Sequence, residues 1–327
     1  MPEFNFDSPK AKKLLFDVAT YYLDEIGVDG FRLDAVIYFY KDITNKNIEL
    51  LNEFNAHCEQ YNEDVYIVGE AWTNKETIAE YYKSNIDSFF YFPGSGANGS
   101  IRTALNLNGQ NARNYYNLAF QLLNNAGDNI PAPFLDNHDM SRLGATSSNI
   151  TKMIYGMLSM LNGTTFTYYG SEIGLTGYVK PDQNVRTYMY WSSGDFIGKC
   201  DNPLGTSKCE YRHPPVDEQL NDENSIINYY KKANLLRNSF SLLARGKLNE
   251  TKSYYDASKG FVSLVKENDE ESIKILLNLS DIDSYEYKLD ESEEVKATLL
   301  VDNNFQVGYN QKLNQIKIPS YGIVILS

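Results

Sequence analysis

Cysteine, histidine and tryptophan are scarce in this sequence of 327 residues, with 3, 3 and 2 copies respectively. So few thiols and imidazoles argue against a structural zinc site. No apolar run is long enough to span a membrane, and residues 1–3 lack the basic start and the apolar stretch of a signal peptide. The net charge of −13 argues against nucleic acid or an anionic membrane surface as a partner. These absences exclude several classes of protein without indicating a function.

The few cysteines leave open which redox compartment the protein occupies. Cys200 and Cys209 flank a loop that contains Gly and Pro, residues 201–208. They could close a small disulfide loop, which would indicate an oxidising compartment, or remain two free thiols. Cys58 lies on the apolar face of a predicted helix, and we expect it to be a buried thiol.

Tyrosine, by contrast, is abundant, with 26 copies in a chain that is 13% aromatic. Aromatic rings can stack on the faces of sugars, and phenol hydroxyls can bond to sugar hydroxyls. Most of these tyrosines are nevertheless expected to be half-buried packing residues.

Helical and strand-like patterns alternate over the first two thirds of the chain. Ser8 and Pro9 are typical of a helix start, apolar residues then recur at helical spacing up to Ile26, and Gly27 ends that helix. Further helices are predicted at 48–58, 78–82, 115–123 and 153–161, and strands just before Asp34 and at 65–68, 89–92, 132–135 and 164–168. About five strand–helix units of this kind predict an α/β fold with a parallel sheet.

The pattern changes after residues 245–246, where short strand-like runs are separated by turn residues and runs of charge. These runs are 260–265, 272–279, 285–289, 297–301, 315–318 and 323–326. Such spacing predicts a small antiparallel β domain. The sequence therefore predicts two domains, residues 1–245 and residues 246–327.

Acidic residues directly follow strand-like runs in segments 30–34 (GFRLD), 68–72 (VGEAW) and 134–139 (FLDNHD). In a parallel α/β sheet the active site lies at the carboxyl ends of the strands, so we expect these carboxylates at one face. Carboxylates gathered in this way suggest acid/base or nucleophilic chemistry on an uncharged substrate. Glycoside hydrolysis is the leading case, because it needs one carboxylate as nucleophile and one carboxylic acid as proton donor.

At these segments the sequence resembles the α-amylase superfamily of glycoside hydrolases, often called family 13. GFRLDA at 30–35 resembles the family's strand-four signature, GEAW at 69–72 its strand-five signature and FLDNHD its strand-seven signature, in the same order. The resemblance covers residues 1–245 by pattern. It implies a partial (β/α)8 TIM barrel, about strands four to eight, followed by a small all-β C-terminal sandwich domain.

The resemblance also implies what this chain lacks. The first barrel strands, with the family signature that carries an Asp and a His on strand three, have no counterpart here. Five strands are too few to close an eight-stranded barrel, so either the chain is a fragment or another polypeptide supplies the remainder. We therefore expect the missing N-terminal half of the barrel to be needed as a partner.

For the reaction itself, the resemblance assigns Asp34 as the nucleophile and Glu70 as the general acid and then the general base. Arg32 alternates with Asp34 along the strand, so the two side chains point to the same side, and the guanidinium would keep that carboxylate ionised. Glu70 needs a raised pKa, which partial burial near Trp72 could provide. The plainer alternatives are a structural ion pair for Arg32 and Asp34 and a solvated strand-end residue for Glu70.

By resemblance, Asp139 would be the third catalytic carboxylate, gripping sugar hydroxyls and favouring the distorted, oxocarbenium-like ring. The expected substrate-binding residues are Arg32, His138 and Arg186, and His138 would donate a hydrogen bond in the same subsite as Asp139. Segment 137–139 could instead be a polar turn or part of a metal cluster, although no second His lies nearby in the sequence. Arg186 resembles a family arginine that contacts the non-reducing sugar, and Glu172 resembles a residue with a structural role.

The resemblance implies that the substrate is an α-glucan. Ala35 resembles members that act on α-1,4 bonds, whereas residues 37–38 are Ile-Tyr in place of the Lys-His found in many α-amylases. We expect a retaining α-1,4-glucan hydrolase acting on starch or maltooligosaccharides. The alternatives are a transglycosylase of the same superfamily and a catalytically inactive fragment.

Cofactor and location complete the expectations. No cofactor or metal is expected in this chain, and calcium is left to the full-length protein, because the family's calcium site draws on the missing part. An extracellular or cell-surface location is expected, with the cytoplasm as the alternative.

Overall fold

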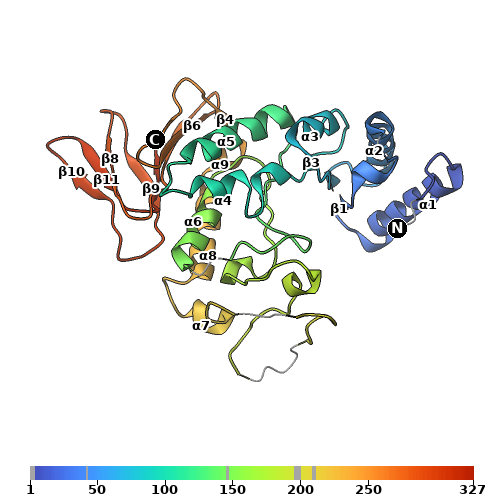
Figure 1. Ribbon diagram of the computed structural model, residues 1–327. Helices are drawn as coiled ribbons and strands as arrows, with labels where there is room; N and C mark the ends of the chain where they lie inside the picture. Colours follow the sequence, from blue (N-terminus) through green and yellow to red (C-terminus); the bar gives the residue numbers. More distant parts are fainter. Residues whose placement is uncertain (1–3, 42, 145–146, 195–199, 208–210) are drawn as a thin grey trace. The chain divides into compact units, whose positions relative to one another are not determined.

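The computed structural model describes residues 4–41, 43–144, 147–194, 200–207 and 211–327 (Figure 1). The chain divides into two compact units. The first contains Met1–Pro93 with Gln121–Ala132, and the second contains Gly94–Phe120 with Pro133–Ser327. None of the helices in the described ranges is long and apolar enough to cross a membrane.

The first unit contains a three-stranded parallel sheet in the order β1 (Gly30–Leu33), β2 (Tyr66–Gly69) and β3 (Ser88–Phe89). A parallel bridge then joins Phe90 to Ala132. Its helices are α1 (Pro9–Thr20), the π-helix η1 (Tyr21–Ile26), the 3-10 helix η2 (Val36–Tyr38), α2 (Thr44–Cys58), α3 (Lys75–Tyr81) and the last part of α5 (Ala112–Ala126). Strands thus alternate with helices here as the sequence predicts.

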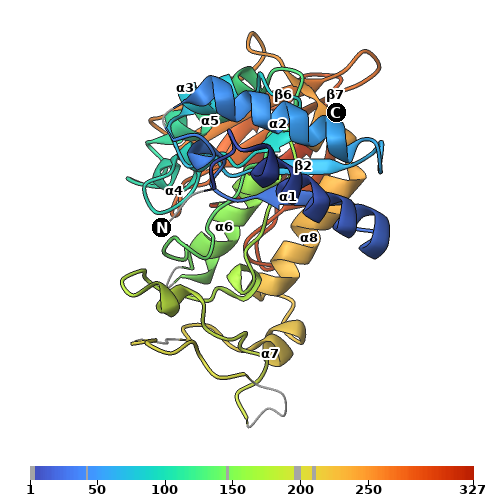
Figure 2. The same cartoon turned by 90° about the vertical axis from the view of Figure 1, so that its right-hand side faces the viewer.

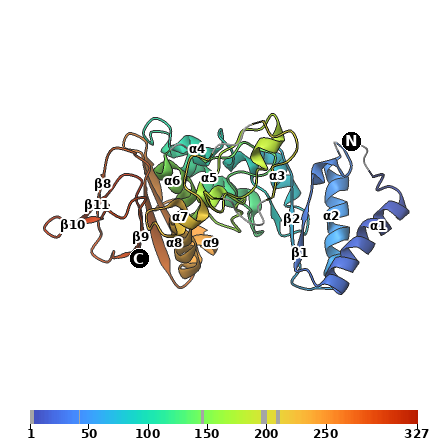
Figure 3. The same ribbon diagram turned by 90° about the horizontal axis from the view of Figure 1, so that it is seen from below.

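The first helix begins and ends where its punctuation indicates. Pro9 occupies the first helical turn, and Gly27 closes the π-helical continuation at φ 76°, which is a left-handed conformation that favours glycine. Figure 3 shows α1 and α2 on one side of β1 and β2. Phe54 of α2 lies between Phe16 of α1 and Phe31 of β1, with ring centroids 6.2 and 5.8 Å away. Aromatic packing therefore fixes both helices against β1, the strand that precedes Asp34.

The predicted strands at 132–135 and 164–168 are wrong in length. Only isolated parallel bridges form there, Phe90 with Ala132 and, in the second unit, Phe134 with Phe166. Pro133 lies inside the first of these segments, and a proline has no N–H to give to a sheet ladder. Phe166 still donates its N–H to the Pro133 carbonyl at 3.1 Å. Parallel pairing is thus retained as single contacts rather than as regular strands.

The second unit contains a buried helix, α6 (Ser148–Ser159). The other helices of this unit are α4 (Ser100–Ala104), most of α5, α7 (Val216–Leu220), α8 (Ile226–Ser239) and α9 (Ser241–Arg245), with the 3-10 turns η4 (Ser171–Ile173) and η5 (Asp182–Val185). Every residue of α6 from Thr151 to Ser159 is buried. Helices α6 and α8 lie side by side (Figure 2), and the stacked rings of Tyr155 and Tyr230 are 3.5 Å apart.

The C-terminal part of the second unit is antiparallel β structure, as the sequence predicts. Its strands are β4 (Lys247–Leu248), β5 (Tyr254–Asp256), β6 (Phe261–Glu267), β7 (Ser272–Asn278), β8 (Tyr285–Lys288), β9 (Val295–Leu299), β10 (Gly308–Asn310), β11 (Gln315–Ile318) and β12 (Ile323–Leu326). One sheet has the order β4-β6-β7-β12-β9, with β5 paired to β6, and the other has the order β10-β11-β8. Buried residues of both sheets, among them Phe261, Leu276, Ile316 and Ile318, form one core. The division at residues 245–246 remains a prediction.

The described cysteines show two different environments. Cys58 is a buried free thiol, and burial raises its pKa to about 12. Cys200 is exposed, while Cys209, with which it could pair, lies outside the described residues. The predicted choice between a disulfide loop and two thiols therefore stays open.

Candidate active site

The paired ends of β1 and β2 bring together the first candidate residues. Leu33 is in register with Gly69, so Asp34 and Glu70 are the next residues along two neighbouring parallel strands. The ladder continues past the strand ends, because Glu70 donates its N–H to the Leu33 carbonyl at 2.9 Å and Val36 donates to the Glu70 carbonyl at 3.0 Å. Backbone hydrogen bonds therefore fix the spacing of the two carboxylate-bearing residues.

Arg32 binds both carboxylates. Its Nη1 lies 2.7 Å from Asp34 Oδ1 and its Nη2 lies 3.0 Å from Glu70 Oε2. The side chain of Asp34 is 74% exposed, whereas that of Glu70 is only 7% exposed. One guanidinium thus joins an open carboxylate to an enclosed one.

The enclosed carboxyl group has a raised pKa. Burial is the largest cause, and the hydrogen bond and negative charge of Asp34 act in the same direction. The positive charge of Arg32 and the N–H of Ala35, 3.3 Å from Glu70 Oε2, act in the opposite direction. Trp72 is half exposed and stacks on Phe92 with ring centroids 4.7 Å apart. The environment of Glu70 favours the protonated acid.

The turn after Asp34 is tight. Ala35 has φ 44°, in the left-handed region that a residue with a Cβ rarely adopts. In that conformation its N–H points to Glu70, and the next side chain, Val36, is completely buried. The chain is thus held in a strained conformation beside the two carboxylates.

A second group of candidate residues lies in the second unit. Arg186 Nη2 forms an ion pair with Asp139 Oδ1, and Arg186 Nε donates to the His138 carbonyl at 2.9 Å. His138 Nε2 lies 3.1 Å from the other oxygen, Asp139 Oδ2. The Asn137 side chain accepts the N–H of Asp139 at 2.9 Å, which makes the local turn. These contacts show that Asp139 is held between a guanidinium and an imidazole.

Two buried residues that sequence reasoning missed hold this turn. Asp136 accepts the N–H of Leu143 at 2.8 Å and the hydroxyl of Ser171 at 2.9 Å, and burial raises its pKa. Arg142 donates to the carbonyls of Tyr169 and Val185 at 2.6 and 3.1 Å.

Arg142 therefore anchors the backbone next to Arg186, while Asp136 closes the loop that carries Asp139. The guanidinium of Arg142 also lies over the rings of Tyr168 and Tyr169, 4.3 and 4.7 Å from their centroids. An arginine three residues after the acidic motif was the one available signal in the sequence.

Glu172 is a half-buried acid near this turn. Its Oε2 atom is buried without a hydrogen-bond partner among the described residues, and burial raises the pKa of its carboxyl group. Among the residues that the structure describes, no three His, Cys, Asp or Glu side chains are grouped so that they could hold a metal ion. Calcium binding stays a prediction.

The structure thus places the six predicted residues in two clusters. Arg32, Asp34 and Glu70 form the β1–β2 cluster of the first unit. His138, Asp139 and Arg186 form the loop cluster of the second unit. The catalytic and binding roles of these residues remain predictions. Chemically, the first cluster offers an exposed carboxyl group beside a buried one whose pKa is raised, and the second offers polar groups suited to hydroxyls.

Comparisons with known proteins agree with the motifs. The family model described as alpha amylase, catalytic domain, matches residues 1–246. The chain belongs to the α-amylase family. It is 33% identical over 292 residues to alpha-amylase 3 of Dictyoglomus thermophilum, which covers 87% of this chain and 56% of that protein. This confirms the resemblance drawn from the three strand-end motifs.

Solved structures give the same picture. Amy13B of Eubacterium rectale is 30% identical, with a TM-score of 0.89 over 100% of this chain and 65% of that one. The α-amylase of H. orenii is 26% identical, with a TM-score of 0.81 and coverage of 100% and 66%. The chain therefore spans between about half and two thirds of the length of these relatives. Its parallel strands and helices are consistent with part of a barrel followed by a β domain.

Proposed function

We propose that the protein is a retaining α-glucan hydrolase whose nucleophile is Asp34 and whose acid/base is Glu70. The observation that carries the proposal is the contrast between two carboxyl groups bound to one arginine. Asp34 is open to a substrate, whereas Glu70 is enclosed and its pKa is raised by burial. Retaining glycosidases need this difference, because one carboxylate attacks while the other donates a proton.

The proposed reaction has two steps. The Asp34 carboxylate attacks the anomeric carbon, and the glycosidic C–O bond breaks as Glu70 gives its proton to the leaving oxygen. Water then attacks the anomeric carbon of the glycosyl ester. Glu70 takes a proton from that water, and the Asp34 carboxylate leaves. Each step inverts the anomeric carbon, so the two together retain its configuration.

Arg32 and the loop cluster have supporting roles in this proposal. Arg32 stabilises the ionised Asp34 between turnovers by a charge-assisted contact of 2.7 Å. Asp139, His138 and Arg186 present a carboxylate, an imidazole and a guanidinium, which can together accept and donate hydrogen bonds to sugar hydroxyls. We assign His138 and Arg186 to substrate binding, and Asp139 to the role of third catalytic carboxylate, which grips sugar hydroxyls and favours the distorted ring without itself forming or breaking a covalent bond.

The substrate is proposed to be an α-1,4-glucan such as starch or a maltooligosaccharide. Ala35 after the nucleophile favours this linkage by resemblance, and relatives of the chain are named alpha-amylase and maltogenic alpha-amylase. Transglycosylation is the second candidate, because a 4-alpha-glucanotransferase of Thermotoga neapolitana is 28% identical over 192 residues. Incubation with maltotriose separates the two. Hydrolysis yields only shorter sugars, whereas transfer also yields sugars longer than maltotriose.

Activity is proposed to need the first barrel strands in addition to this chain. Among the described strands β1 pairs only with β2, which leaves its other edge for a further strand. The residues whose spacing indicates the first helix, such as Leu14, Val18 and Ile26, are about half exposed rather than packed.

We further propose an extracellular or cell-surface location.

The stereochemical course tests the proposal most simply. The experiment uses the completed barrel, meaning this chain joined to the missing first strands, and follows fresh hydrolysate by proton NMR. We expect the α-anomer to form first. Initial formation of the β-anomer would mean direct attack by water and would remove Asp34 as nucleophile. For the 327-residue chain alone, we expect no release of reducing sugar from starch.

A further inference from the structure

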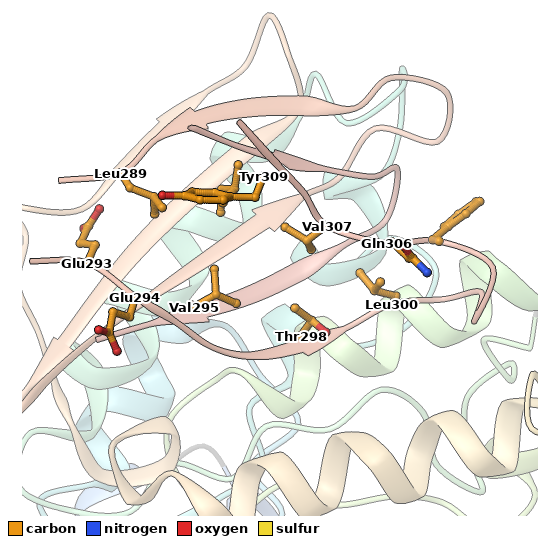
Figure 4. Close-up of a pocket in the computed structure, with 11 residues that line it drawn as sticks. Leu289, Glu293, Glu294, Val295, Thr298, Leu300, Gln306, Val307 and Tyr309 are labelled. Atoms are coloured by element: carbon orange, nitrogen blue, oxygen red, sulfur yellow. The ribbon is translucent and has the colours of Figure 1, made fainter. Parts of the chain in front are cut away.

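A hollow of about 660 Å³ lies in the C-terminal β structure, apart from the residues of both candidate clusters. It opens beside the outer strands β9 and β10, which are the edges of the two sheets. Figure 4 shows Tyr309 on one side of this hollow and Val295 and Thr298 on the other. Its volume falls within the range of about 300–1,000 Å³ that is typical of small-ligand sites.

The floor of the hollow is apolar. Leu289 and Ile316 belong to the buried core between the two sheets, and Val307 packs against that core. The hollow is therefore a place where the core reaches the surface instead of being covered by an outer strand. An apolar floor favours a ligand that has an apolar face to bury.

The rim is aromatic and polar. The side chain of Tyr309 is 57% exposed, and its hydroxyl group is fixed by Asn314 Oδ1 at 3.0 Å. Thr298 and Gln306 also line the hollow, and neither side chain forms a hydrogen bond to any other residue that the structure describes. An oriented ring beside unused hydroxyl and amide groups suits a molecule with an apolar face and polar edges.

The charges at the rim indicate an uncharged ligand. Glu293 is paired with Lys274, and Glu294 is paired with Lys296 at 2.7 Å. Because each carboxylate that lines the hollow already has a lysine partner, little net charge is offered to an ionic ligand. Neither an anion nor a cation is favoured over a neutral molecule.

A polypeptide strand is disfavoured at the same place. The edge strand β9 carries Lys296 directly after Glu294 and Val295, and its register with β12 shifts at Ile325 and Leu326. Charges and irregular register on an edge strand are features that prevent a further strand from adding. The other edge, β10, is only three residues long. The occupant is thus more consistent with an oligosaccharide than with a peptide.

We propose that this hollow is a second α-glucan site, with Tyr309 as the stacking platform and with Thr298 and Gln306 as hydroxyl-binding groups. The proposal rests on the proposed function, because that function supplies the class of sugar. Such a site would hold a long glucan on the protein without taking part in bond cleavage. Its affinity should be modest, in the millimolar range of about −4 kcal/mol.

The test is binding of maltoheptaose to the 327-residue chain by isothermal titration, with retention of the chain in native gels that contain amylose as a second readout. Tyr309→Ala should weaken binding at least fivefold, and Tyr309→Phe should retain most of it because the ring remains. Leu313→Ala is the matched control, since Leu313 is similarly exposed on the same β structure but does not line the hollow. Asp139→Asn reports on the candidate active site.

The outcomes separate this proposal from the proposed function. Binding that is lost in Tyr309→Ala but kept in Leu313→Ala and Asp139→Asn supports the second site. Binding that is lost only in Asp139→Asn overturns the second site and leaves the proposed hydrolase standing. Absence of maltoheptaose binding in every form also overturns the second site, whatever the completed barrel does to starch. Conversely, maltoheptaose binding that depends on Tyr309, together with a completed barrel that does not hydrolyse starch, would support the second site and overturn the proposed hydrolase function.

Discussion

The β1–β2 cluster and the loop cluster are built by different kinds of bonds. In the first, backbone hydrogen bonds between neighbouring strands set the spacing of Asp34 and Glu70, and Arg32 joins their side chains. In the second, side chains do this work, because Asp136 and Arg142 hold the segments that carry Asp139 and Arg186. A strand ladder suits the residues proposed to make and break bonds, which need a fixed separation. A side-chain network suits groups that only bind hydroxyls.

Predictability from the sequence follows the same difference. The alternation of side chains along a strand places Arg32 and Asp34 on one side, and the structure shows their contact of 2.7 Å. Helix punctuation by Pro9 and Gly27 is equally local and is confirmed. Such features depend on residues that are close in the sequence, so a single chain reveals them.

Long-range features were harder to predict. Nothing local shows that Arg142 would bond to the carbonyls of Tyr169 and Val185, which are 27 and 43 residues away. The hollow beside Tyr309 could not be predicted either, because it depends on where the edge strands β9 and β10 of the two sheets lie. The short pairing at 132–135 could have been anticipated, because Pro133 interrupts the ladder.

Removing the proposed nucleophile should give the largest effect. In the completed barrel, Asp34→Asn should lower kcat on maltooligosaccharides by about 10⁴-fold or more, because a barrier rise of several kcal/mol is expected and each 1.4 kcal/mol is tenfold. Steady-state kinetics measures this. Asp64→Asn is the control, as an exposed aspartate that lies outside both clusters. Near-normal turnover by Asp34→Asn would show that another residue is the nucleophile.

Replacing the acid/base should cost less and depend on the leaving group. Glu70→Gln should lower kcat on maltooligosaccharides by about 10²–10⁴-fold, the usual range for general acid catalysis. A glycosyl fluoride needs little protonation on leaving, so the first step with that substrate should be nearly unaffected. An equal loss with both substrates would show that Glu70 is not the acid.

The raised pKa of Glu70 also predicts a pH effect on stability. A folded-state pKa above the unfolded value favours the folded state when the group is protonated, and that stability is lost as the pH rises through the folded pKa. Glu70→Gln should therefore stabilise the chain at pH values above the folded-state pKa of Glu70, and should have little effect at pH values below its unfolded-state pKa. Urea unfolding at acidic and neutral pH measures the difference. A variant that is destabilised at neutral pH would show that the ionised carboxylate is the favoured form.

Weakening the side-chain network should affect the loop cluster alone. Arg142→Met leaves the Tyr169 carbonyl without its donor and removes one of the two donors to the Val185 carbonyl, and we expect a loss of about 1–3 kcal/mol in unfolding free energy. Thermal and urea unfolding would report it, with the exposed Arg113→Met as a matched control. Equal stability of the two variants would mean that the network does not hold the loop.

The smallest effect is expected from the exposed arginine of the loop cluster. Arg186→Ala removes the ion pair to Asp139 and a donor to the His138 carbonyl. In the completed barrel we expect KM for maltooligosaccharides to rise about tenfold, or about 1.4 kcal/mol, with kcat changed much less. A fall in kcat at constant KM would assign the loop cluster to bond cleavage instead of substrate binding.

Covalent trapping tests the central claim most directly. The completed barrel is treated with a 5-fluoro glycosyl fluoride, which slows hydrolysis of the glycosyl ester, and peptide mass spectrometry locates the label. We expect one sugar attached to the peptide that contains Asp34, and no label in Asp34→Asn. A label on Asp139 or Glu70, or the same labelling in Asp34→Asn, would contradict it.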